Sequence, residues 1–386
     1  MVSRDSDEEE YSPPVKRRKV QPTKEQILKQ RLQSSNLPSS VKRDALQRLE
    51  SSDKEKNVEW VENLLKIPFG KVRPLPVNRD DSPSKIKKYF LKAQKMLDTA
   101  VYGMKNVKEE VLNYIAQFIS TDTKSTPRII GLCGSPGTGK TCIIRKGFAK
   151  ALDRPIQCLS MGGLRDSNYF LGHDYTYVGS RYGIIVQSLI SHQCMNGIIF
   201  MDEIDKVSGY DGSEIQNMLM HLTDPAQNYE FHDKYFSGIN IDLSKVIIVF
   251  GMNDEKLIDP ILRDRIHIIH VPDPTMKEKV TIGKDYLLRE IESNIGFKQG
   301  EIELEPEVVE YMIKKFCKDQ KGVRKLKKCI ESILLKVNTG RYLWGKEQPY
   351  KCLKEMKMPF KVTKDVVDEL IDFKEPEDKY LTSMYL

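Results

Sequence analysis

The chain has 386 residues, of which 30% are charged and 39% hydrophobic, and its formal net charge is +7. This length supports two or three domains with cores of their own, and so modest a basic excess permits a nucleic-acid partner without implying one. No apolar run is long enough to span a membrane, and Met1 is followed by charged residues instead of an apolar leader. We therefore expect a soluble intracellular protein, nuclear or cytoplasmic, without a membrane partner.

The seven cysteines are scattered along the chain and form no C-x-x-C pair. They offer neither a disulfide framework nor a zinc site, which favours a reducing compartment. The six histidines likewise lack the spacing of a metal site.

Residues 1–24 are polar, and we expect them to form a disordered tail. An acidic patch over 7–10 is followed by a basic cluster from Lys16 to Lys19. The cluster has three interpretations: a nuclear import signal, a nucleic-acid patch, or a solvated run without an address.

Apolar residues recur at helical spacing from residue 25 onward, with a break at Asn36-Leu37-Pro38 and a proline-rich loop over 74–83. Two further helical patterns follow over 86–98 and 107–120. The region 25–124 is therefore expected to be all-helical.

The block 125–271 has a different pattern, because short β-branched runs alternate with helical patterns. This alternation is typical of a parallel sheet in an α/β domain. The predicted strands cover 128–133, 155–159, 197–201, 246–250 and 266–271.

Beyond Pro272 and Pro274 we expect no further strands. The remaining helical patterns predict a helical lid subdomain over 272–370, followed by a tail over 371–386. The predicted lid helices cover 277–292, 306–316 and 321–342.

The first predicted strand leads into a glycine-rich turn and then a helical pattern over 142–152, which is the context that a P-loop requires. Glycines let consecutive N–H groups turn inward around a phosphate, and the helix dipole adds positive potential at the helix start. Lys140 can reach the β- and γ-phosphates, and the Thr141 hydroxyl can ligate Mg²⁺. We therefore expect the chain to bind a nucleoside triphosphate. The cradle consists of Gly134, Ser135, Pro136, Gly137, Thr138, Gly139, Lys140 and Thr141.

Two carboxylates end the predicted strand 197–201. Asp202 lies where it can hold Mg²⁺ opposite Thr141, and Glu203 is a candidate general base for the attacking water. After the next strand, Asn253 is either a residue that aligns this water or an ordinary turn residue.

Two arginines, Arg263 and Arg265, precede the last predicted strand. An arginine next to a nucleotide stabilises charge on the transferred phosphoryl group and can come from a neighbouring subunit. The pattern does not choose between the two, and a surface salt bridge is the alternative. Between the two nucleotide motifs lies an aromatic, glycine-rich segment with Tyr175, Tyr177 and Tyr182, which indicates either core packing or an exposed flexible loop.

Taken together, these motifs resemble the ATPase module of Lon-type AAA+ proteases over about residues 25–370. The resemblance implies ATP and Mg²⁺ as ligands and a ring of identical subunits, with a hexamer the expected form. It is carried by Gly162-Gly163-Leu164-Arg165-Asp166, Thr176-Tyr177-Val178-Gly179, Asp202-Glu203-Ile204-Asp205-Lys206, Asp224-Pro225-Ala226-Gln227-Asn228, Leu262-Arg263-Asp264-Arg265 and Gly322-Val323-Arg324.

The resemblance also assigns roles. It implies that Asn253 senses the γ-phosphate, that Arg265 reaches the ATP of the neighbouring subunit, and that Arg324 is the sensor in the lid. Tyr177 and Val178 fall where the family places the pore loop that grips a threaded polypeptide.

The sequence departs from that family in two respects. We find no counterpart of the Ser-Lys protease domain that follows the lid, so we do not expect peptidase activity from this chain alone. Asp174-Tyr175 also replaces the two arginines that commonly precede the pore tyrosine.

The leading hypothesis is therefore an ATP-hydrolysing protein remodeller or unfoldase that acts on polypeptides. The alternatives are a nucleic-acid-associated ATPase, and an ATPase or regulatory partner of a separate peptidase or of a full-length Lon ring.

Overall fold

The computed structural model describes residues 23–51, 54–121, 127–164, 166–177, 179–207, 213–343, 349–354 and 356–371. The basic cluster of Lys16–Lys19, Val178 and the C-terminal residues 372–386 lie outside this part. Its helices and strands form two compact units, divided between Phe69 and Gly70.

The first unit is a bundle of three helices around Trp60, whose ring is fully buried. A capping box starts the first helix, because the Thr23 and Gln26 side chains each bond the other's backbone N–H. The Arg48 guanidinium lies 4.3 Å from the centre of the Trp60 ring, a favourable cation–π distance. The helices are α1 (Lys24–Ser34), α2 (Ser39–Glu50) and α3 (Lys54–Leu64).

The second unit is built on a five-stranded sheet in the order β2-β3-β6-β1-β7, in which every pair is parallel. The carboxyl ends of β1, β3 and β6 therefore lie at one edge of the sheet. All five strands expected in the block 125–271 are confirmed, with ends that shift by one or two residues. They are β1 (Ile130–Cys133), β2 (Ile156–Ser160), β3 (Ile198–Asp202), β6 (Ile247–Met252) and β7 (His267–His270).

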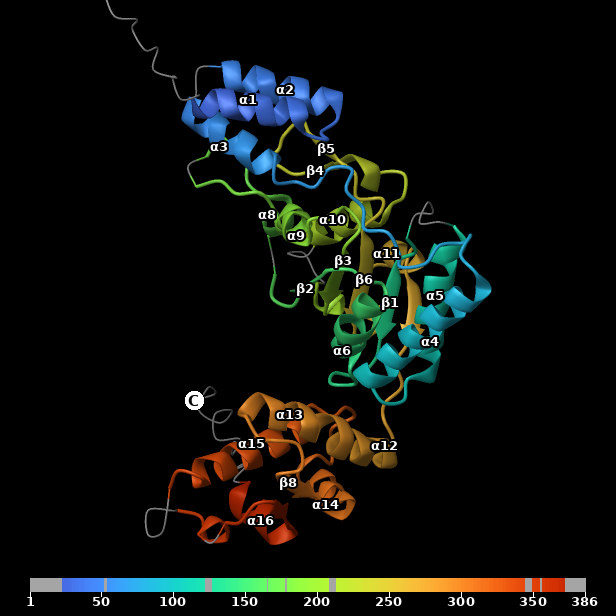
Figure 1. Ribbon diagram of the computed structural model, residues 1–386, viewed down its shortest axis with the longest axis vertical. Helices are drawn as coiled ribbons and strands as arrows, with labels where there is room; N and C mark the ends of the chain where they lie inside the picture. Colours follow the sequence, from blue (N-terminus) through green and yellow to red (C-terminus); the bar gives the residue numbers. More distant parts are fainter. Residues whose placement is uncertain are drawn as a thin grey trace, which may run out of the picture. The chain divides into compact units, whose positions relative to one another are not determined.

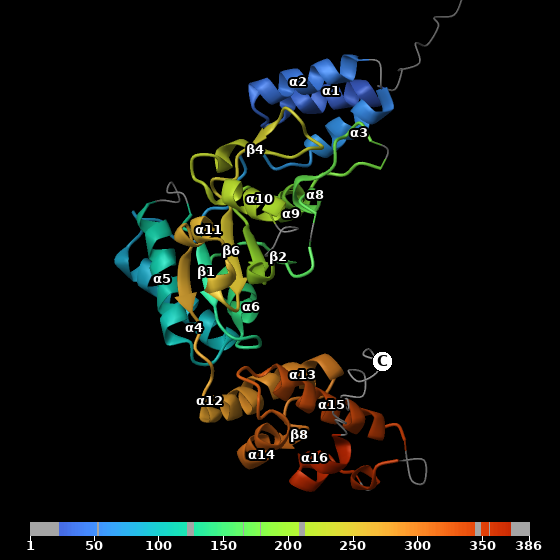
Figure 2. The ribbon, with the colours of Figure 1, turned by 180° about the vertical axis from the view of Figure 1, so that it is seen from behind.

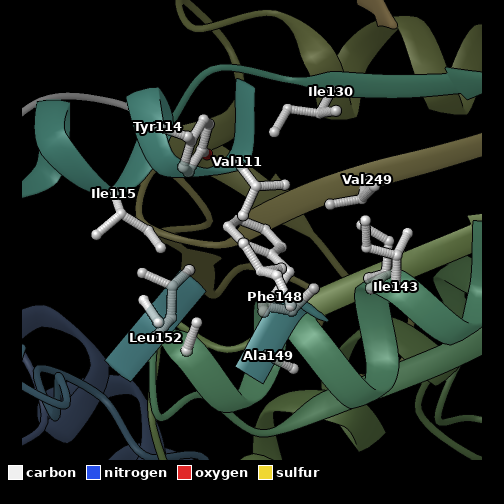
Figure 3. Packing of buried hydrophobic residues seen from close by; sticks show 14 of the residues in the cluster. Val111, Tyr114, Ile115, Ile130, Ile143, Phe148, Ala149, Leu152 and Val249 are labelled. Atoms are coloured by element: carbon white, nitrogen blue, oxygen red, sulfur yellow. The ribbon is translucent and has the colours of Figure 1, made fainter. Parts of the chain in front are cut away.

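Helices α4 (Pro83–Ala100) and α5 (Lys105–Ser120) lie beside this sheet in both views (Figures 1 and 2). Their apolar faces join the helix that follows β1, which runs through α6 (Lys140–Cys142), the π-helical η1 (Ile143–Phe148) and α7 (Ala149–Ala151). Figure 3 shows Tyr114 and Phe148 in this core, with ring centres 5.4 Å apart. The helical region expected over 25–124 thus supplies helices to both units.

The other helices before the lid are short. They include α8 (Asn168–Leu171), α9 (Ile184–His192), α10 (Ser213–Thr223) and α11 (Pro260–Asp264). A small antiparallel hairpin that the sequence analysis missed pairs β4 (Phe231–His232) with β5 (Asn240–Ile241).

The region 272–371, here called the lid, contains strands, so the expectation of none beyond Pro274 is wrong. β8 (Ile302–Leu304) pairs in parallel with β9 (Phe360–Val362), and in both strands the outer residues are buried and the middle one exposed. Three residues are too short to give a strand pattern, and the partner lies far along the chain. The lid helices are α12 (Met276–Thr281), which continues through the π-helical η6 (Ile282–Leu287) into α13 (Leu288–Ile295), then α14 (Pro306–Phe316), α15 (Arg324–Gly340) and α16 (Lys364–Leu370).

Within the described residues, every helix is too short or too polar to cross a bilayer.

Candidate nucleotide-binding site

The glycine-rich turn leaves β1 at Cys133 and enters the next helix at Lys140. Gly137 and Gly139 have φ values of +79° and +103°, which side-chain-bearing residues rarely adopt. A Cβ on Gly134 would lie 2.6 Å from the Val271 carbonyl oxygen. The glycines are therefore required by backbone geometry at three positions of the cradle.

Lys140 is buried in this cradle and bonds to it directly. Its ammonium donates to the carbonyl oxygens of Gly134 and Ser135 and, over 3.1 Å, to Oδ1 of Asn253. Burial lowers the pKa of Lys140, while the nearby carboxylates of Asp202 and Asp205 oppose that shift. The structure thus brings Lys140 and Asn253 together, although they are far apart in sequence.

The Thr141 hydroxyl donates to Oδ2 of Asp202 over 3.0 Å. Asp202 ends β3 and lies against Gly251 of the adjacent β6, where any Cβ would be 2.3 Å from Oδ1. A hydroxyl and a carboxylate are oxygen ligands of the kind that Mg²⁺ prefers. These two side chains therefore fit a magnesium ion next to the phosphate cradle. Within the described ranges, no cluster of three or more His, Cys, Asp or Glu side chains forms a metal site made by protein ligands alone.

Glu203 leaves the strand in a left-handed conformation, with φ of +64°. Positive φ is strained for a residue with a side chain and is often found at functional sites. Its carboxylate pairs with Lys206 Nζ at 2.7 Å and lies against Gly162. Glu203 is thus close to Asp202 in the chain, but its side chain has a different partner.

Asp205 belongs to the site, although the sequence analysis gave it no role. It is 5% exposed, and its Oδ2 accepts the backbone N–H groups of Asn253 and Asp254 at 3.1 and 3.4 Å. The short helix η2 (Ile204–Lys206) turns this carboxylate toward the end of β6. Asp205 therefore fixes the backbone that presents Asn253 to Lys140. Its place three residues after Asp202 is the sequence signal.

The start of α15 in the lid touches the glycine-rich turn. The Val323 N–H donates to the Gly137 carbonyl oxygen over 3.0 Å, and a Cβ on Gly322 would lie 2.4 Å from the carbonyl oxygen of Pro136. A Cβ on Gly137 would lie 2.9 Å from Cβ of Arg324. Arg324 is therefore placed beside the cradle, and its role as the sensor in the lid stays a prediction.

A cavity of about 790 Å³ opens beside the cradle, a size that suits a nucleoside. Two contacts span it: the Tyr286 hydroxyl donates to the Asp98 carbonyl oxygen over 2.9 Å, and Lys146 pairs with Glu290 at 2.8 Å. No local pattern signals this cavity, because its walls come from α4, the P-loop helix and the lid. Its lining includes Val101, Tyr102, Met104, Thr138, Gly139, Cys142, Ile282, Tyr286 and Val323.

Comparison with known proteins agrees with the resemblance that the sequence motifs indicate. Residues 130–273 match the family model described as "ATPase family associated with various cellular activities (AAA)". Among curated proteins, the chain is 36% identical over 319 residues to a "Lon protease homolog" of Acanthamoeba polyphaga mimivirus, covering 80% of this chain and 31% of that protein. Residues 130–273 form an AAA ATPase domain of the Lon type. The resemblance expected from the motifs is confirmed, as is the α/β P-loop fold.

Two further relatives show the same extent of similarity. The Lon protease of Helicobacter pylori (strain ATCC 700392 / 26695) is 33% identical over 298 residues, which are 75% of this chain and 34% of that protein. The mitochondrial Lon protease homolog 3 of Arabidopsis thaliana is 39% identical over 247 residues, 64% of this chain and 26% of that protein. The chain thus spans between a quarter and about a third of the relatives' length.

The two candidate arginines of the AAA domain have partners in their own chain. Arg265 donates to the Met220 carbonyl oxygen at 2.6 Å and pairs with Asp224 at 3.3 Å, whereas Arg263 pairs with Glu255 at 3.1 Å. These contacts lie at the end of α10 and at η5 (Glu255–Leu257), which closely follows Asn253 in the chain. Within one chain, the structure does not bring Arg265 to the cradle.

Tyr177 lies in the AAA domain on the segment between α8 and α9, and its side chain is 70% exposed. It does not join the residues around Lys140. Its neighbour Val178 lies outside the described residues. The pore-loop role of both residues stays a prediction.

Proposed function

We propose that the AAA domain hydrolyses ATP with Mg²⁺ and that the cycle drives remodelling of polypeptides by a ring of identical subunits. The observation that carries the first part is the convergence of Lys140, Asn253, Thr141 and Asp202 through two hydrogen bonds at one edge of the sheet. Similarity to Lon proteins supports the second part.

Each side chain has a defined task in this proposal. Lys140 leaves the Gly134 and Ser135 carbonyl oxygens and binds the β- and γ-phosphates. Thr141 and Asp202 would hold Mg²⁺, which would supply positive charge next to the phosphate oxygens. Asn253, whose backbone Asp205 holds, aligns the attacking water.

Glu203 takes the proton of that water as general base. To do so it must exchange Lys206 for the water, since the carboxylate is paired with Lys206 in this structure. Arg265 must likewise leave Asp224 to reach a nucleotide on the next subunit. Arg324, at the start of α15, stabilises the phosphates from the lid side.

The decisive experiment is Mg·ATP turnover and ATP binding in Glu203→Gln, with Lys206→Ala as the matched control. Removing the base should lower turnover by about a hundredfold or more while ATP binding is kept. The Lys206 variant frees Glu203 and should retain turnover. Undiminished hydrolysis in Glu203→Gln would show that this carboxylate is not the base.

Polypeptide remodelling is tested by the increase of ATPase rate on addition of unfolded casein. Tyr177→Ala should abolish the increase, whereas Tyr342→Ala, which removes a tyrosine that is 75% exposed in the lid, should not. Mass measurement with Mg·ATP should show a ring. A chain that stays monomeric and is not stimulated would contradict the proposal.

A second candidate function rests on the exposed face of α4. Lys87, Lys88 and Lys92 are exposed on this helix next to Leu91, and none of the three has an ion pair within the described residues. An unpaired basic face can bind a nucleic-acid backbone. Replacing the three lysines by glutamine should abolish retardation of DNA at low salt; absence of retardation by the unmodified chain would eliminate this function.

A further inference from the structure

Asp233 is a fully buried carboxylate outside the nucleotide site. Its Oδ2 accepts the N–H of Gly183 over 2.7 Å, and its Oδ1 accepts the N–H of Tyr235 over 2.9 Å. Burial raises the pKa of Asp233 to about 7, while N–H donors from Gly183, Tyr235 and Phe236 oppose the shift. A buried charged group is costly unless it is well bonded, so this carboxylate needs an explanation.

Gly183 is one end of the segment that carries Tyr177. It precedes α9, and Gly172 at the other end follows α8. The two ends meet, because the His173 N–H donates to the Arg181 carbonyl oxygen over 3.0 Å. The segment 172–183, here called the Tyr177 loop, is therefore closed at its base.

The base is packed so closely that neither glycine can be replaced without a shift. A Cβ on Gly172, whose φ is +77°, would lie 2.8 Å from the Gly183 nitrogen and 2.9 Å from Asp233 Oδ1. A Cβ on Gly183 would lie 1.9 Å from the Phe170 carbonyl oxygen. The Asp233 carboxylate is thus in contact with both ends of the loop.

Residues beside Asp233 hold the same base. The Lys234 N–H donates to the Leu171 carbonyl oxygen over 2.7 Å, and its ammonium donates to Asn168 Oδ1. The Tyr182 ring stacks on that of Phe236, with centres 5.9 Å apart. Residues 233–236 directly follow β4. Asp224, the partner of Arg265, lies earlier in the chain, directly after α10.

We propose that Asp233 is the positioning residue that fixes the base of the Tyr177 loop and so sets how Tyr177 meets a polypeptide. The inference rests on the proposed function, because it takes Tyr177 as the contact to the polypeptide. A carboxylate suits the task since both of its oxygens accept N–H groups. An asparagine of the same shape presents an amide N–H₂ to one of these donors and loses that bond.

The test compares Asp233→Asn with Asp242→Asn, which alters an exposed carboxylate that accepts the Ser244 N–H after the same hairpin. Asp233→Asn should raise the KM for casein stimulation about tenfold while the basal ATPase rate is kept within about twofold. Asp242→Asn should match the wild type. Wild-type stimulation by casein in Asp233→Asn would overturn the inference.

Amide hydrogen exchange tests the role of Asp233 independently of the proposed function. Asp233→Asn should speed amide exchange in the Tyr177 loop, most clearly at Gly183, whereas Asp242→Asn should not. If the wild type is not stimulated by casein, the proposed function fails, and exchange still decides: unchanged exchange at Gly183 overturns the role of Asp233. Should Asp233→Asn fail to fold, Lys234→Ala removes the exposed contact to Asn168 and should speed loop exchange about threefold; no change there contradicts the inference.

Discussion

The sheet and the lid contribute to the candidate nucleotide site in different ways. The sheet presents Asp202 and Asn253 at the ends of the adjacent strands β3 and β6, and Lys140 at the start of the helix that follows β1. Lys140 bonds Asn253, and Thr141 bonds Asp202. The lid reaches the same place through the close approach of Gly322 to the turn and the contacts of Tyr286 and Glu290.

The difference shows how the two regions divide the work. Parallel strands are held by ladders of backbone hydrogen bonds, so the groups at their ends keep fixed mutual positions. The lid contacts are few and largely polar, and such contacts open at low cost in free energy. The sheet thus supplies a fixed cradle, and the lid supplies an adjustable wall.

Lys140→Met should lower ATP affinity more than the other changes, because it removes the ammonium from the phosphate cradle. The ammonium that binds the phosphates is lost while the side-chain volume is nearly kept, so ATP affinity should fall about a hundredfold or more. Calorimetric titration with Mg·ATP measures this. Lys150→Met, in an exposed lysine of the same helix, should bind as the wild type does, and equal affinities of the two variants would contradict the role of Lys140.

Gly322→Ala should separate the lid from the cradle. Its Cβ would lie 2.4 Å from the Pro136 carbonyl oxygen and 2.6 Å from the Gly137 carbonyl carbon, so the backbone must shift and the Val323–Gly137 hydrogen bond is lost. We expect ATP affinity to fall about tenfold. The same titration on Lys321→Ala, an exposed neighbour, is the control, and an unchanged affinity in Gly322→Ala would show that this approach is dispensable.

His192→Phe should alter how the free energy of unfolding depends on pH, and His192 lies in the unit that contains the sheet. Burial, reinforced by Arg73, lowers the pKa of His192 to about 4, and neither ring nitrogen has a hydrogen-bond partner within the described residues. Because the unfolded chain binds a proton below its ordinary pKa of about 6.5 and the folded chain does not, this histidine contributes stability that is lost as pH falls from about 6.5 to about 4. The free energy of unfolding falls by about 3 kcal/mol over this pH range.

Asp233 acts with the opposite sign in this range. Its raised pKa contributes stability at low pH that is lost as pH rises through about 7. The difference between wild type and His192→Phe cancels this contribution. Urea unfolding at pH 7 and pH 4.5 should therefore show a smaller acid loss in the variant, and identical losses would mean that His192 is protonated in the folded state.

Lys146→Ala should lower ATP affinity least. Its ion pair with Glu290 is partly exposed, at 48% and 32% for the two side chains, and such pairs are worth less than about 1 kcal/mol. Although partial burial opposes the shift, Lys146 and Lys327 lower the pKa of Glu290. ATP affinity at low salt should fall about twofold, and the difference should vanish at high salt. A tenfold loss that persists at high salt would show that Lys146 touches the nucleotide.

Local patterns suffice for the sheet and for the cradle. Runs such as Ile247–Met252 are apolar throughout because the strand is buried on both faces, and Gly139 must be glycine because of its backbone. The same reasoning placed Asp202 and Glu203 at the end of a strand. It left Asn253 open between two roles, since only the fold brings this residue to Lys140.

Sequence patterns do not reveal the partners of groups that act through packing. Asp205 lies three residues after Asp202, but it accepts the N–H of Asn253, 48 positions away. Asp233 accepts from its near neighbour Tyr235 and also from Gly183, 50 positions away. β8 and β9 are three residues each and are recognisable only as a pair. Contacts between residues far apart in the chain could therefore not be predicted from the sequence.

The resting partners of Lys140 affect how the cycle ends. In this structure the ammonium is satisfied by two carbonyl oxygens of its own loop and by Asn253. In the proposed function, an arriving nucleotide has to replace these oxygens as the partners of the ammonium. The same oxygens are available to accept from it again once product leaves.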